Sequence, residues 1–160
     1  MRCDECGFEY EDVTAAEVPE RLRQGARALA GLLTGEVRRR PAEGVWSPLE
    51  YGCHVRDMID TQRYRIELAL REDCPTFAPM GRDELVVTSR YNEQDPDVVR
   101  VELVRTADAL ADYLEALSPE EQHRTGIYQY PAPAERTIVW IGVNTVHELV
   151  HHAMDVARPI

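Results

Sequence analysis

Residues 46–57 read WSPLEYGCHVRD, and their first letters carry the clearest structural signal in the chain. Ser47 suits the N-cap of a helix, and Pro48 suits the first helical position. Glu50 follows the serine by three residues, which completes a capping box in which each side chain binds the other residue's backbone N–H. The stretch therefore predicts a helix that begins at Pro48, and the spacing of apolar residues extends it to about Arg71.

Three further segments show the three- and four-residue spacing of apolar side chains that is typical of amphipathic helices. The first spans residues 14–35, and the next spans residues 95–118, where Ser118-Pro119 ends it. The last follows Thr137, a suitable N-cap, and extends to about residue 158. Four helices of this length predict an all-α fold, an antiparallel four-helix bundle with long crossover connections.

Two of the connections are long for a compact domain. Residues 74–94 lack a sustained period, and because connections of this length are often retained for function, we expect part of a binding pocket there. Residues 118–136 are rich in tyrosine and proline, which suits an extended or short-hairpin stretch. The candidate pocket residues are Trp46, Tyr91, Asn92, Tyr128 and Tyr130. We expect residues 1–160 to form a single domain, with residues 1–13 as an N-terminal extension.

The composition is that of a globular protein, and it argues against two classes of partner. The chain is 44% hydrophobic and 29% charged, and its apolar runs fall short of the roughly 20 residues that a membrane span requires. Its net charge of -11 opposes binding to nucleic acid phosphates, which depends on clustered Lys and Arg. The acidic start does not resemble a secretory signal. We therefore expect a cytoplasmic protein with no nucleic acid or membrane partner.

Residues 145–155, TVHELVHHAMD, place His147 and His151 four residues apart in the last predicted helix. Side chains at this spacing lie one above the other on one helix face and can bind one metal ion together. His54 stands in the middle of another predicted helix, and helical bundles build metal sites from facing helices. The predicted metal ligands are thus His54, His147 and His151, although the four-residue spacing alone also occurs by chance.

The other histidines and two carboxylates have subordinate roles in this prediction. His152 lies about 100° around the helix from His151, so we interpret it as a residue at the surface or behind the ligands. His123 falls in a connection and is a weaker candidate. Asp57 and Asp155 can accept the second ring N–H of a ligating imidazole, or can form ordinary salt bridges. Three imidazoles suit zinc, nickel, copper or iron, and three protein ligands leave an open coordination position, as in catalytic sites.

Cys3 and Cys6 have the C-x-x-C spacing of a zinc knuckle or a redox pair, but no second such pair completes a structural zinc site in the sequence. Three alternatives stay open: reversible disulfide chemistry, delivery of a thiolate to the histidine-bound metal, and a tail without function. Cys53 is expected to be a small buried residue. Cys74 lies beside a proline in the long connection and carries no specific prediction.

The order of these motifs along the chain resembles the DinB/YfiT-like superfamily. The residues that carry the resemblance are Trp46, Ser47, Glu50, His54, His147 and His151. The resemblance covers nearly the whole chain and implies a four-helix bundle whose three histidines bind a divalent metal, often zinc or nickel. Characterised members of the superfamily include thiol-dependent transferases and isomerases, which use mycothiol, bacillithiol or glutathione.

The resemblance implies an enzyme whose metal holds a low-molecular-weight thiol as thiolate, the nucleophile toward a small electrophile. Our leading hypothesis is a metal-dependent, mycothiol-type S-transferase that uses zinc or nickel and a thiol cosubstrate. Activation of water by the same metal would instead give a hydrolase. Two alternatives involve no turnover: a metal-binding or redox-sensing module that uses Cys3 and Cys6, and an interaction protein that pairs as a homodimer.

Overall fold

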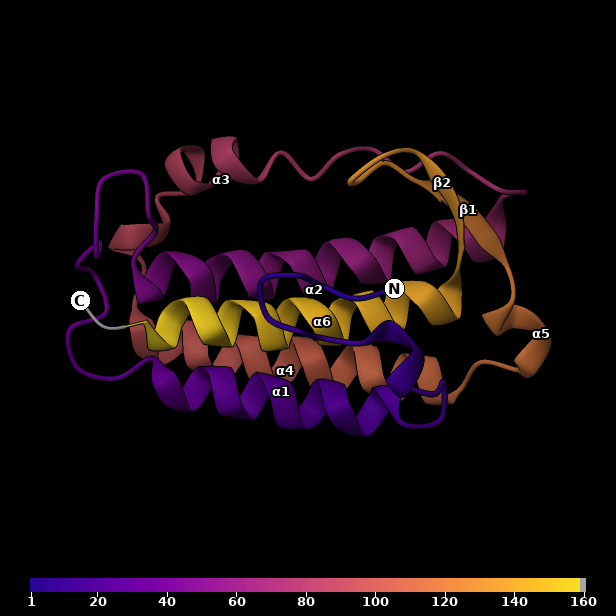
Figure 1. Cartoon of the computed structure of the whole chain (residues 1–160), viewed down its shortest axis with the longest axis horizontal. Coiled ribbons are helices and arrows are strands. Elements are labelled where there is room, and N and C mark those ends of the chain that lie inside the picture. The colour runs from indigo at the N-terminus through magenta and orange to yellow at the C-terminus, as the bar shows by residue number, and fades with distance from the viewer. Residues whose placement is uncertain (159–160) are drawn as a thin grey trace.

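The computed structural model describes residues 1–158 and consists of a bundle of four long helices (Figure 1). These helices are α1 (Val18–Leu32), α2 (Pro48–Arg71), α4 (Pro96–Glu115) and α6 (Ile138–Ala157). The shorter elements are η1 (Tyr10–Asp12), α3 (Arg82–Thr88), η2 (Tyr91–Glu93), α5 (Pro119–Gln122), β1 (Thr125–Tyr128) and β2 (Ala134–Thr137). The predicted four-helix bundle is confirmed. Within the described residues, no helix combines the length and the apolar character that crossing a membrane requires.

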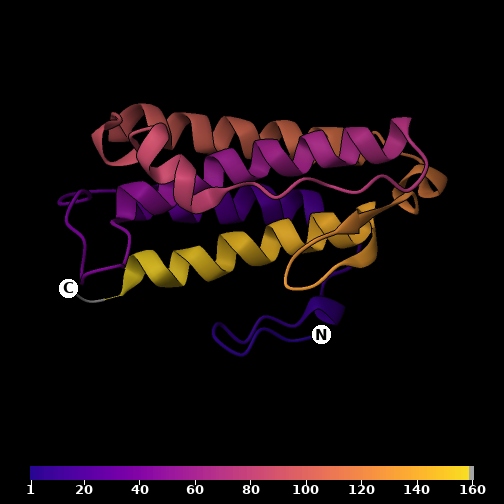
Figure 2. The same ribbon diagram turned by 90° about the horizontal axis from the view of Figure 1, so that it is seen from above.

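The long connections determine the directions of the four helices. Residues 72–95 return along the length of the bundle, so α4 runs in the same direction as α2 (Figure 1). Helix α1 is antiparallel to α4: Arg23 pairs with Glu115 near the end of α4, whereas Arg100 near its start donates to the carbonyl of Leu33. Helices α1 and α6 are parallel neighbours, and α6 is antiparallel to α2 (Figure 2). The bundle therefore contains two parallel and two antiparallel pairs of neighbouring helices.

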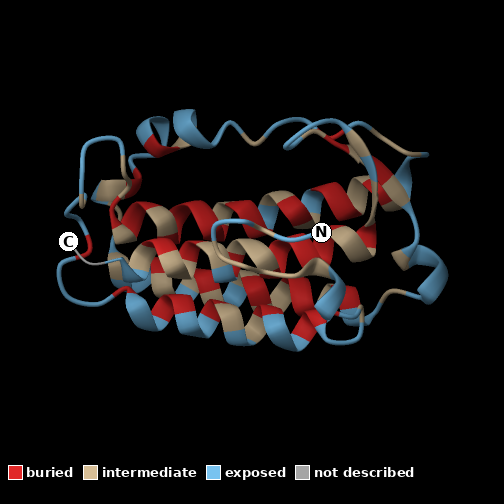
Figure 3. Ribbon diagram, viewed as in Figure 1, coloured by how far each residue is buried: buried red, intermediate tan, exposed pale blue. Residues whose placement is uncertain are grey.

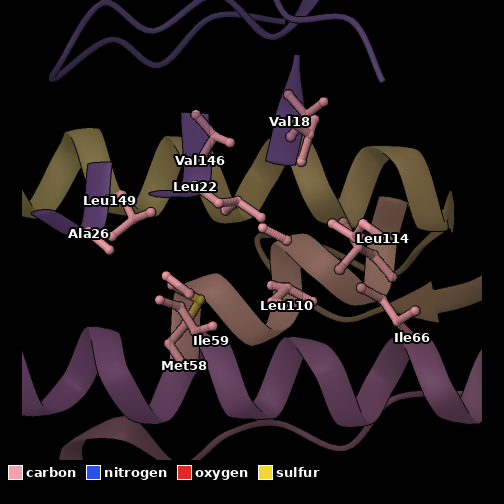
Figure 4. Packing of buried hydrophobic residues seen from close by; sticks show 14 of the residues in the cluster. Val18, Leu22, Ala26, Met58, Ile59, Ile66, Leu110, Leu114, Val146 and Leu149 are labelled. Carbon is pink, nitrogen blue, oxygen red and sulfur yellow. The ribbon is translucent and has the colours of Figure 1, made fainter. Parts of the chain in front are cut away.

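All four helices contribute apolar side chains to the core, which lies on their inward faces (Figures 3 and 4). Its fully buried members include Leu22, Leu29, Ile59, Ile66, Leu103, Leu110, Ile141 and Leu149. Burying one such side chain contributes roughly 1.5–3 kcal/mol relative to leaving it exposed, so this core is the main stabilising feature. A smaller apolar cluster surrounds Tyr91 near the start of α2, and Cys53 is fully buried in it, as predicted.

The capping box at the start of α2 forms as the sequence predicts. The Glu50 backbone N–H donates to Ser47 Oγ at 3.1 Å, and the Ser47 backbone N–H donates to Glu50 Oε2 at 2.8 Å. Arg40 then donates to both oxygens of the Glu50 carboxylate, at 3.0 and 2.6 Å. Because Glu50 is 1% exposed, this pairing compensates a buried charge. The start of α2, which carries His54, is thereby held in place.

Three segments differ in detail from the sequence prediction. Helix α1 begins at Val18 rather than residue 14, because the Glu17 carboxylate accepts from the backbone N–H and hydroxyl of Thr14 in a separate turn. The long connection contains α3, whose seven residues are too few to show a helical period. The stretch before α6 forms a β1–β2 hairpin with antiparallel register from Thr125↔Thr137 to Tyr128↔Ala134, which agrees with the predicted short hairpin.

Gly126 in β1 offers a direct test of this packing. A Cβ at this position would clash with the ring of Phe77, which is 1% exposed. We expect Gly126→Ala to lower the free energy of unfolding by about 1–3 kcal/mol, as overpacking of a tight core does. Chemical denaturation measures the change. The matched control is Gly31→Ala in α1, where nothing lies within 4 Å of the added Cβ, and it should stabilise the helix by about 0.5–1 kcal/mol. Equal stability of Gly126→Ala and wild type would contradict the described packing.

Candidate metal centre

Helix α6 presents polar side chains on two adjacent faces. Successive residues of an α-helix point about 100° apart, so neighbours in sequence face different surroundings. His152 faces α2, where its ring centroid lies 5.0 Å from that of His54. His147 instead contacts Phe8 and Tyr10 of the N-terminal segment, with ring centroids at 5.4 Å in both cases. Among the described residues, the two faces therefore carry two clusters of potential ligands, and a third group, His151, His152 and Asp155, spans both faces.

The first cluster consists of His54, Glu148 and His152. One ligand atom from each residue lies within 4.8 Å of the others. The two histidines are 3% and 5% exposed, and their rings are perpendicular. Glu148 Oε2 lies 3.2 Å from His152 Nε2. Among the described residues, none forms a hydrogen bond to the buried Nδ1 atom of His54. Two imidazoles and a carboxylate thus converge in the interior of the bundle.

Burial and neighbouring charges set the protonation of this cluster. Burial, reinforced by the nearby His152, lowers the pKa of His54 to about 4, so the His54 ring is neutral near pH 7. Burial opposes the charged form of His152 too, but hydrogen bonds to Asp155 and Glu148 raise its pKa to about 9. Burial likewise opposes ionisation of Glu148, yet hydrogen bonds from His147 and His152 lower its pKa. Glu148 is therefore an ionised carboxylate that pairs with the charged ring of His152.

The residues around the first cluster fix its orientation. Asp155 Oδ2 lies 3.0 Å from His152 Nδ1, which leaves Nε2 directed toward Glu148. The partly exposed rings of Trp46 and Tyr51 lie 5.2 Å from His54 and 5.3 Å from His152, respectively. The cluster is thus bordered by aromatic side chains on the side of α2.

The two predicted supporting carboxylates behave differently. Asp155 contacts two imidazoles, as predicted for a supporting carboxylate. Its Oδ2 atom lies 3.0 Å from Nδ1 of His152 and 3.7 Å from Nε2 of His151. Asp57 accepts hydrogen bonds from Arg56 and from the Tyr91 hydroxyl instead of from a histidine. Asp57 therefore anchors the long connection to α2 rather than orienting an imidazole.

The second cluster consists of Cys3, Cys6, His147 and His151. One ligand atom from each of these four residues lies within 4.8 Å of the others. The N-terminal segment, residues 1–13, lies along the outer side of α6 (Figure 2). Its two thiols thereby come close to the helix. Burial opposes ionisation of Cys3, but backbone and histidine hydrogen bonds lower its pKa to about 6. All four side chains are partly exposed.

The structure does not bring the three predicted histidine ligands together. His54 faces Glu148 and His152, whereas the H-x-x-x-H pair lies against the N-terminal segment. His152 is 5% exposed and lies beside His54, so it is not a surface residue. Glu148 was not among the predicted ligands, although Glu148 and His152 have the same four-residue separation as His147 and His151. The α6 residues that lie beside His54 are therefore Glu148 and His152, each one position toward the C-terminus from His147 and His151.

The other candidate residues lie in different places. His123 is exposed at the end of α5, with Nδ1 2.6 Å from the carbonyl oxygen of Pro119. Of the candidate pocket residues, Trp46 borders the first cluster, while Tyr128 is buried in the core and Tyr130 is 75% exposed. Asn92 accepts a hydrogen bond from Ser47 near the start of α2. The long connection thus supports α2 more than it lines the cluster.

Comparisons with known proteins agree with this architecture. Residues 19–155 match the DinB superfamily, whereas no curated protein sequence matches the chain. YfiT from Bacillus subtilis, described as a probable metal-dependent hydrolase with an unusual four-helix bundle topology, is similar with a TM-score of 0.77 at 15% identity. The match covers 90% of this chain and 86% of YfiT.

A second similar structure is the mycothiol-dependent maleylpyruvate isomerase, with a TM-score of 0.75 at 16% identity. The match covers 94% of this chain but 63% of the isomerase, so this chain spans less than two thirds of that protein. Identities this low show a shared fold. The family follows from the match over residues 19–155, and the shared fold agrees with it: this chain belongs to the DinB superfamily.

Proposed function

We propose that this protein is a metal-dependent enzyme in which His54, Glu148 and His152 bind zinc or nickel and a low-molecular-weight thiol attacks a small electrophile. The observation that carries the proposal is the convergence of two buried imidazoles and one carboxylate, with the Nδ1 atom of His54 buried and without a hydrogen bond among the described residues. A buried polar atom is costly unless it finds a partner, and a metal ion would supply one.

The donor set suits a catalytic first-row metal. Two nitrogen atoms and one carboxylate oxygen form the ligand set of several zinc enzymes, in which three protein ligands leave a position for substrate or water. Magnesium and calcium prefer sites made of oxygen atoms, so they fit this set less well. A bound ion would displace the proton that His152 carries on Nε2 to solvent, and Asp155, which accepts from Nδ1, would then hold the ring in the tautomer whose Nε2 lone pair faces the metal.

A thiol needs less activation than water at such a site. The pKa of a free thiol is about 8.5 and that of water about 15.7, and a bound divalent ion would act as a Lewis acid that lowers either value. The carboxylates of Asp155 and Asp57 are both engaged, by His152 and by Arg56 with Tyr91, so they are poorly placed to take a proton from water. The name of the similar isomerase, which is mycothiol-dependent, also favours a thiol.

The residues beside the cluster would receive the reactants. Trp46 and Tyr51 present partly exposed aromatic rings next to the two ligand histidines. The guanidinium of Arg82 lies 5.9 Å from the centre of the Trp46 ring and adds positive charge at this border. We infer that this border binds a small polar molecule and that its aromatic rings restrict the access of water.

Metal content tests the ligand assignment. We expect His54→Ala and His152→Ala each to lose one equivalent of zinc or nickel relative to wild type, because two protein ligands hold a divalent ion poorly. Elemental analysis of protein purified without a metal-affinity tag measures the loss. His123→Ala, which removes an exposed histidine that belongs to none of the candidate ligand groups, is the matched control and should keep the wild-type content. Unchanged metal content in both cluster variants would contradict the assignment.

Turnover tests the reaction. With mycothiol and a panel of small electrophiles, wild type should consume thiol and electrophile together, and Glu148→Gln should be slower by about 100-fold or more because metal activation is weakened. The assay follows loss of free thiol and of electrophile and formation of the thioether. Metal-dependent consumption of a substrate without thiol would contradict the role of the thiol and favour a hydrolase. Bound metal without any turnover would favour the metal-binding or redox-sensing alternative.

A further inference from the structure

The N-terminal segment folds back on itself and places both of its thiols on the side that faces α6. The backbone N–H of Cys3 donates to the carbonyl of Phe8 at 2.9 Å, and that of Gly7 donates to the carbonyl of Cys3 at 2.8 Å. Gly7 has a φ of 76°, in the left-handed region that favours glycine. A Cys-x-x-Cys-Gly turn of this kind brings two sulfur atoms close together, as in zinc-binding loops.

Hydrogen bonds around His147 identify which of its ring nitrogens is free. The Tyr10 hydroxyl donates to Asn144 Oδ1 at 2.7 Å and lies 3.0 Å from His147 Nδ1. Since a hydroxyl has one hydrogen, His147 Nδ1 must be the donor to the tyrosine oxygen. Nε2 then carries the lone pair. This Nε2 atom is buried and has no hydrogen-bond partner among the described residues.

The same reasoning applies to His151. Its Nε2 atom lies 3.6 Å from a carboxylate oxygen of Glu5 and 3.7 Å from one of Asp155. Two carboxylates around Nε2 favour a proton on that nitrogen, which leaves the lone pair on Nδ1. His151 Nδ1 lies 3.7 Å from Cys3 Sγ. His151 thus directs Nδ1 toward Cys3. His147 keeps Nε2 without a hydrogen-bond partner among the described residues, and one of its ring nitrogens lies within 4.8 Å of the ligand atoms of Cys3, Cys6 and His151.

We propose that Cys3, Cys6, His147 and His151 form a second metal site, a closed tetrahedral zinc site that fastens residues 1–13 to α6. Two thiolates and two imidazoles are the ligand set of structural zinc, and four protein ligands leave no open position. The soft sulfur ligands select zinc over harder divalent ions. On binding, Cys3 and Cys6 would release their protons to solvent. The site shares no ligand with the first cluster.

The need for such a fastening is visible in the segment itself. Phe8 and Tyr10 pack against His147, and Tyr10 stacks on Trp140 with ring centroids at 5.8 Å. Most of residues 1–5 are exposed, so few apolar contacts hold the start of the chain. Short segments with so little core commonly depend on a metal or disulfide for their structure.

Cobalt binding distinguishes this site from the first cluster. Reduced, metal-free full-length protein is titrated with Co²⁺, which gives a thiolate-to-cobalt charge-transfer absorption when cysteine is a ligand. We expect two ions per wild-type chain and this absorption. The double variant Cys3→Ser/Cys6→Ser should bind one ion and lose the charge-transfer absorption. Glu148→Gln and His54→Ala should each bind one ion and keep the charge-transfer absorption. Cys74→Ser, which removes a thiol elsewhere, is the matched control and should keep both.

The outcomes separate this proposal from the proposed function. If His54→Ala binds one ion fewer than wild type and keeps the charge-transfer band, both sites are supported. If His54→Ala keeps the band and binds as many ions as wild type, only the second site is supported. Absence of the charge-transfer band in wild-type protein would overturn the second site. Disappearance of the band in both His54→Ala and Glu148→Gln would also overturn it, since a cysteine would then bind the same ion as the first cluster. As a structural readout, zinc should slow proteolysis within residues 1–13 in wild type and not in Cys3→Ser/Cys6→Ser.

Discussion

The rotation of α6 about its own axis determines which of its polar side chains face α2 and which face the N-terminal segment. Each residue advances about 100° around a helix, so a small rotation exchanges one row of side chains for the next. Close contacts with α1 fix this rotation: a Cβ added to Gly25 would lie 3.2 Å from Leu149, and one added to Gly142 would lie 3.1 Å from Val18. With α6 in this position, one polar row faces α2 and the adjacent row faces residues 1–13.

Two carboxylates link the clusters on these rows. Glu148 lies 3.2 Å from His152 Nε2 and 3.5 Å from His147 Nδ1. Asp155 lies 3.0 Å from His152 Nδ1 and 3.7 Å from His151 Nε2. Each carboxylate thus contacts one histidine from each cluster. A fixed position of the side chains in one cluster therefore also restrains a carboxylate that contacts the other cluster. The N-terminal segment, which the superfamily match over residues 19–155 does not include, is in this way connected to the centre of the bundle.

Much of the fold could be predicted from the sequence, because local rules define it. The capping box at Ser47 placed the start of α2, and apolar periodicity located all four long helices. The row of α6 that faces His54 could not be predicted, since H-x-x-x-H and E-x-x-x-H have the same spacing. Residues 1–13 also cover the face of His147, which removes the contrast between a buried and an exposed face. The approach of Cys3 to the histidines of α6 was one of three alternatives that the sequence left open, because a contact between residues more than 140 positions apart has no local pattern.

The division of ligands between two faces of α6 is tested most directly by a crystal structure of the zinc-loaded protein with anomalous scattering recorded at the zinc edge. Two separate zinc peaks are expected, one bounded by His54, Glu148 and His152, and the other by two sulfur atoms and the histidines of the H-x-x-x-H pair. The Zn–S distances at the second peak should be about 2.3 Å. A single zinc ion bound jointly by His54 and the H-x-x-x-H pair would contradict this division.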